Sequence, residues 1–151
     1  MHCGDRDELV LTTINSGADS SSASADAEGS ASVTANIAAV TFDKDEITSC
    51  IIDAVQSKAA FGVDGTAGEV SANVLSKNQL GEAYGMKKFS GIGKEWNEQA
   101  AAFCEYVTGK TAGEVAGIAM TETTAPADAD LSSSVSIAVG GFLGLVEKAA
   151  K

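Results

Sequence analysis

The chain has 151 residues, of which 44% are apolar and 21% are charged, and its net charge at pH 7 is −11. This length suits one ordinary domain with a core of its own. The acidic balance repels phosphate backbones and anionic lipid headgroups, so we expect neither a nucleic-acid partner nor binding to a membrane surface. No run of about 18 apolar residues occurs, so we expect no membrane-spanning segment.

The first seven residues, MHCGDRD, are interpreted as a tail or an expression remnant, and residues 8–151 as a single domain. Cys3, followed by Gly4 and polar residues, is how a mature bacterial lipoprotein begins after its signal peptide has been removed. On that interpretation a lipid on Cys3 is the only attachment to a membrane. On the alternative interpretation Cys3 is accidental, and both stay open.

The residue pattern of the first half of the chain predicts β-strands. Residues 8–15 (ELVLTTIN) and 31–42 (ASVTANIAAVTF) are β-branched and alternating, and residues 47–55 (ITSCIIDAV) return after a hairpin turn at 43–46. Residues 16–30 are rich in Ser, Ala and Asp, which predicts a loose, flexible connection. Residues 69–76 are a further short-strand candidate.

From Lys77 onward the apolar spacing changes to that of helices. A helix ending at Gly109 is predicted by apolar residues at intervals of four, three and four, and a capping box at 111–114 starts a second, short helix. The apolar pattern from Leu131 to Ala149 predicts one long terminal helix with Asp130 near its N-cap. Strands that precede helices indicate an α+β fold with an antiparallel sheet packed by C-terminal helices.

Few residues are suited to catalysis. The cysteines at positions 3, 50 and 104 form no C-x-x-C pair, and the chain has a single histidine, so a four-ligand zinc site is not expected. Cys50 and Cys104 are interpreted as buried free thiols, with a disulfide or a redox role as the alternative. The serines at 132–134 and 136 have no histidine to activate them. We therefore expect a binding protein, or at most an electron carrier, rather than an enzyme.

The stretch SGIGKEWNE, residues 90–98, is the best candidate for a ligand site. Gly91 and Gly93 permit a tight turn with exposed N–H groups ahead of a helix, and Lys94 and Lys88 add positive charge, which together suit an anion or a phosphate. The alternative is an ordinary helix entry with solvated lysines.

Aromatic side chains flank this stretch. Tyr84 and Phe89 suit the two sides of a planar ligand, with a place in the core as the alternative. For Trp96 we favour the core, because it belongs to the apolar face of the predicted helix.

Three segments carry a resemblance to a known family: AAVTFDKDEITSCIIDAVQSK, the block from KNQLGEAYGM to AGEVAGI, and PADADLSSSVSIAVGGFLGLVEKAA. Over residues 35–151 the chain resembles extracytoplasmic lipoproteins of anaerobic Gram-positive bacteria and, through them, the FMN-binding domain superfamily. It departs from that superfamily at Glu46, where glycine is preferred. It also has LSSSVSIA in place of the Ser-Gly-Ala-Thr motif that carries covalent FMN.

The resemblance implies a cell-surface location and FMN held non-covalently, either near Ser134 and Ser136 or at the 90–94 turn, for electron transfer. The alternative is a surface lipoprotein module that binds another small molecule, such as a planar anion, or a protein partner.

Overall fold

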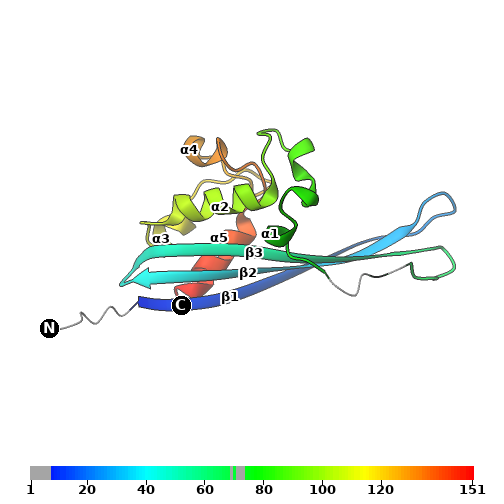
Figure 1. The fold of residues 1–151 in the computed structure, drawn as a ribbon, viewed down its shortest axis with the longest axis horizontal. Coiled ribbons are helices and arrows are strands. Elements are labelled where there is room, and N and C mark those ends of the chain that lie inside the picture. The colour runs from blue at the N-terminus through cyan, green and yellow to red at the C-terminus, as the bar shows by residue number, and fades with distance from the viewer. Residues whose placement is uncertain (1–7, 69, 71–73) are drawn as a thin grey trace.

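The computed structural model describes residues 8–68, 70 and 74–151 and shows a sheet with helices packed on one of its faces (Figure 1). The sheet is antiparallel, with the strand order β1-β2-β3. This confirms the α+β fold. The elements are β1 (Glu8–Ser21), β2 (Gly29–Asp43), β3 (Glu46–Phe61), α1 (Lys77–Leu80), 3₁₀ turns at Gly81–Tyr84 and Met86–Lys88, α2 (Trp96–Val107), α3 (Ala112–Ala116), α4 (Ala129–Ser132) and α5 (Gly140–Ala149).

The two faces of the sheet differ in burial. Along β2, Ala38 and Val40 point toward the helices and have no exposed surface, whereas Val33 and Ile37 on the opposite face are 54% and 39% exposed. The alternation predicted for residues 31–42 is therefore confirmed, since one face of the strand is covered and the other is not. Lys44, in the β2–β3 turn, has a φ of 56°, which matches the hairpin predicted at 43–46.

The strands are longer than predicted. β1 continues to Ser21 and β2 begins at Gly29, so the prediction of a loose segment over residues 16–30 is wrong except for the connection at 22–28. The backbone ladder orders these small polar residues, because it requires no apolar side chains. The far ends of the three strands project past the helices as an arm (Figure 1). Part of the strand candidate at 69–76 lies outside the described residues.

Glycine is required at one position of this arm. A Cβ on Gly29 would lie 2.6 Å from the ring of Phe61 and 2.6 Å from the backbone nitrogen of Ala23. The Phe61 ring therefore packs directly on the β2 backbone.

The core lies between the sheet and the two longest helices. α2 packs on β3, and α5 packs on β1 and β2. Phe142 of α5 meets Trp96 and Phe103 of α2 edge to face, with ring centroids 5.7 and 5.4 Å apart. Trp96 is 4% exposed, so its predicted place in the core is confirmed.

The prediction of one long terminal helix is wrong. The chain forms α4, then an irregular stretch, and then α5 from Gly140, and the N-cap of α4 is Asp128 rather than Asp130. The backbone N–H groups of Ser136 and Ile137 donate to the side-chain oxygen of Gln99 instead of to a helical carbonyl. Among the described residues, no helix is long and apolar enough to cross a membrane.

Candidate functional site

The turn predicted to hold an anion uses its backbone donors within the protein. The N–H groups of Ile92 and Lys94 each lie 3.4 Å from the Ser90 hydroxyl oxygen, and that of Gly93 donates to the Ser90 carbonyl oxygen at 3.0 Å. Because these N–H groups bond within the turn, the geometry favours the alternative of an ordinary helix entry. Gly93 has a φ of 65°, the left-handed backbone that the tight turn requires.

The start of α2 is occupied by carboxylates of the protein itself. The Glu98 carboxylate accepts from the N–H of Glu95 at 2.7 Å, and the Glu95 carboxylate accepts from the N–H groups of Met86 and Lys87. These negative charges sit where the helix dipole attracts an anion. The anion site at Gly91, Gly93 and Lys94 stays a prediction, and the N–H groups of Gly93 and Lys94 already bond within the turn.

The predicted aromatic pair differs in its surroundings. Phe89 is 88% exposed, whereas Tyr84 is half-buried and packs against the core. The ammonium of Lys77 lies 4.8 Å from the centre of the Tyr84 ring and 5.0 Å from that of Trp96. One face of Tyr84 is therefore taken by a cation of the protein. Lys88 is exposed beside Phe89.

Gln99 joins the two segments that the sequence offered separately as ligand sites. Its side-chain nitrogen donates to the Ser90 hydroxyl at 3.2 Å and to the Lys94 carbonyl at 3.1 Å. Its oxygen accepts from the N–H and the hydroxyl of Ser136. The structure thus brings the 90–94 turn and the Ser134–Ser136 segment close together. The sequence analysis missed Gln99, although a glutamine on the apolar face of a helix is the available signal.

A groove of about 460 Å³ lies elsewhere, between the edge of β3 and one side of α2. The residues of α2 that line the groove recur at helical spacing, on the side of the helix next to its buried apolar face. The lining consists of Thr48, Ser49, Cys50, Ile51 and Ile52 of β3, Asn78 of α1, and Asn97, Ala101, Cys104, Glu105 and Thr108 at α2.

Other parts of the chain occupy the β3 edge at both ends of this groove. The N–H of Ile47 donates to the Lys110 carbonyl at 2.9 Å, so the chain after α2 pairs with β3 there. At the other end the Asn78 side chain donates to the Ile52 carbonyl at 3.0 Å. Ile52 and Cys50 are two residues apart, so the N–H and C=O of Cys50 also point away from β2 into the groove. Of the described residues, none pairs with the outward N–H and C=O of Cys50 between these two ends.

The polar groups of the groove favour a ligand that donates hydrogen bonds. The side-chain oxygen of Asn97 is buried and has no hydrogen-bond partner among the described residues. Glu105 adds an exposed carboxylate on the same side of α2. An acceptor without a partner is costly to bury, so a donor placed at Asn97 gains a hydrogen bond at little expense.

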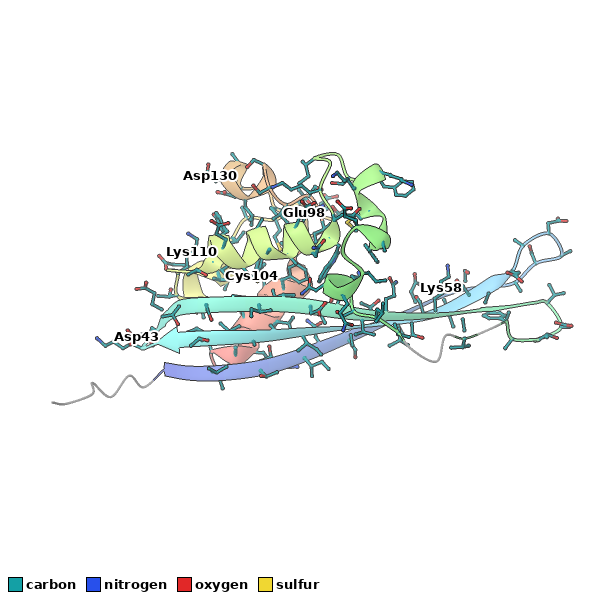
Figure 2. All side chains as sticks on the ribbon, viewed as in Figure 1. Asp43, Lys58, Glu98, Cys104, Lys110 and Asp130 are labelled. Atoms are coloured by element: carbon teal, nitrogen blue, oxygen red, sulfur yellow. The ribbon has the colours of Figure 1, made fainter. Side chains whose placement is uncertain are left out.

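Two thiols line this groove, that of Cys50 on β3 and that of Cys104 on α2. Figure 2 shows Cys104 where α2 approaches β3. The sulfurs of Cys50 and Cys104 are 3.2 Å apart. The hydrogen-bonding contact with Cys50 and a further hydrogen bond from the N–H of Ile52 lower the pKa of the Cys104 thiol, against the effect of burial. The same sulfur contact, followed by burial, raises the pKa of Cys50.

Comparison with known proteins finds no matching family model, curated protein or solved structure. Among the described residues, no group of three or more His, Cys, Asp or Glu side chains could hold a metal ion. Function must therefore be argued from the geometry of the sites.

Proposed function

We propose that this protein is a binding module that takes an extended, cationic segment of a polypeptide partner into the groove between β3 and α2. The observation that carries this proposal is the open edge of β3 at Cys50, with α2 alongside and the edge occupied on either side of the gap. A peptide backbone supplies the N–H and C=O groups that such an edge lacks, as in other cases of strand addition.

The dimensions of the groove suit a short peptide. Residues 48–52 of a strand span about 17 Å, and the 12 residues of α2 span about 18 Å. The helix therefore flanks the β3 side of the groove along its whole length. Lysine or arginine side chains of the peptide would face Glu105 and the acidic surface of a protein with a net charge of −11.

The test uses a seven-residue random peptide library displayed on phage, followed by titration of the selected synthetic peptides. Ala101 lies exposed on the groove side of α2, so Ala101→Trp fills the groove without disturbing the core. The matched control is Ala129→Trp, at an exposed alanine of α4. We expect basic peptides to be selected, and at least tenfold weaker binding to Ala101→Trp alone, since about 1.4 kcal/mol corresponds to tenfold. Equal binding to both variants would refute the proposal.

Non-covalent flavin binding is the second candidate, and Gln99 is the observation that favours it, because it holds the 90–94 turn beside Ser134 and Ser136. On this proposal the protein would be an electron carrier. Titration of FMN and of riboflavin into the protein, followed by flavin fluorescence, tests it. Saturable quenching with FMN preferred would support a site with a phosphate anchor, and quenching by neither would exclude flavin.

Placement at the outer cell surface, with a lipid on Cys3, belongs to the same proposal. It rests on the family resemblance, which would make Cys3 the attachment point of the lipid. Cys3 itself lies outside the described residues.

A further inference from the structure

Cys50 and Cys104 come from distant parts of the chain and meet at one point. They are 54 residues apart in sequence, yet their sulfurs are 3.2 Å apart. A disulfide bond is about 2.05 Å long, so a movement of about 1 Å would bring the sulfurs to bonding distance.

The pair is accessible from one side. Cys104 is 6% exposed and Cys50 is half-buried, and both line the open groove. A small molecule in the groove can therefore reach the sulfurs without unfolding of the core. The described residues offer no third metal-ligating side chain here, so two thiols alone do not form a structural metal site.

We propose that Cys50 and Cys104 are a modification site, which an oxidant of the disulfide class converts to an intramolecular disulfide that joins β3 to α2. The thiolate of one cysteine attacks a sulfur of the oxidant, forms a mixed disulfide and releases one thiol. The second cysteine loses its proton to solvent and attacks the protein sulfur of that mixed disulfide, which releases the second thiol. Two protein thiols are thereby oxidised, and one external disulfide is reduced to two thiols.

Because the inference rests only on the sulfur geometry, it does not depend on the proposed peptide or flavin binding. An extracytoplasmic protein would meet the oxidising conditions in which such bonds persist.

The test is made in a Cys3→Ala background, so that Cys50 and Cys104 are the only thiols. The folded protein is equilibrated with oxidised glutathione, unfolded, and treated with N-ethylmaleimide before intact mass measurement. We expect a species lighter by two hydrogens that takes up no maleimide, and one linked peptide that contains both cysteines after proteolysis. Reduction should restore two maleimide-reactive thiols.

The matched control, Cys50→Ser in the same background, should yield a glutathione adduct on Cys104 or the free thiol, and no internal bond. Two results would overturn the inference in the Cys3→Ala protein. One is that both thiols remain reactive toward maleimide after oxidation. The other is that each sulfur carries its own glutathione and no linked peptide forms.

Discussion

Gln99 uses its buried amide fully, and it is the residue that orders the helical layer. It has no exposed surface, and its side chain bonds to Ser90 and Lys94 on one side and to Ser136 and Ile137 on the other. A buried amide that meets all its partners fixes one arrangement of the surrounding loops, because any alternative leaves polar groups unpaired.

We expect Gln99→Leu to lower the free energy of unfolding by about 2–4 kcal/mol, since it keeps the volume but leaves several buried groups without partners. Urea unfolding followed by circular dichroism measures this. The control Gln56→Leu changes an exposed glutamine of β3 and should cost less than about 0.5 kcal/mol. Equal losses in the two variants would show that Gln99 has no special role.

At the scale of elements, α3 depends on its cap. The Thr111 hydroxyl accepts from the N–H of Glu114, and the Glu114 carboxylate accepts from the N–H of Thr111 at 2.8 Å. That hydrogen bond lowers the pKa of Glu114 below its ordinary value of 4.5, and nearby Lys110 adds to the effect. The stability of α3 therefore depends on pH, because its cap needs the ionised Glu114 carboxylate.

Because the pKa of Glu114 is lower in the folded than in the unfolded chain, the unfolded chain binds the proton more readily. The stabilising contribution is complete above the unfolded pKa, near 4.5, and is lost as the pH falls through the lower folded value. We expect Glu114→Gln to be less stable than the parent at pH 7, and this gap to close toward pH 2–3. Urea unfolding at several pH values measures it. Glu122→Gln, at an exposed loop carboxylate, is the control, and a gap that persists in acid would contradict the prediction.

The elements that the sequence predicts well are those determined by neighbours along the chain. The Thr111–Glu114 capping box, the apolar face of α2 around Trp96, and the hairpin at Lys44 each depend on a few adjacent residues. The elements that it predicts poorly depend on distant partners. The 131–149 pattern has helical spacing, but Gln99, which lies 37 residues before Ser136, diverts two of its N–H groups.

The candidate sites also divide into features set by adjacent residues, which the sequence predicts, and features set by distant partners, which it does not. The glycines of the 90–94 turn predict a ligand site, but Ser90, which engages the N–H groups of Ile92 and Lys94, determines what the turn can bind. The groove at Cys50 was not predicted, because it exists only where β3 and α2 lie side by side. Its two cysteines have no local motif, and their 54-residue separation gives no signal of contact.

For the whole molecule, the exposed apolar surface favours association between copies of the chain, whereas the net negative charge opposes it. The long sheet carries its helices on one face and leaves apolar side chains such as Ile14, Val33 and Ile51 exposed on the other or at its edge, at 54%, 54% and 65%. A net charge of −11 keeps copies of such a molecule apart. The same charge opposes folding, because it brings like charges closer together in the compact state than in the unfolded chain.

We therefore expect sodium chloride to stabilise the protein at pH 7. Raising the ionic strength from about 0.01 to about 0.15 M shortens the Debye length from about 30 to about 8 Å, which screens the repulsion between carboxylates on the surface. A gain of about 1 kcal/mol would raise the midpoint of thermal unfolding by about 3 °C in a chain of this length. Calorimetry at pH 7 and near the isoelectric point of 4.3 measures it. The rise should vanish near pH 4.3, where the net charge approaches zero. A fall in the midpoint with salt at pH 7 would instead mean that attractive ion pairs, rather than repulsion, dominate the surface.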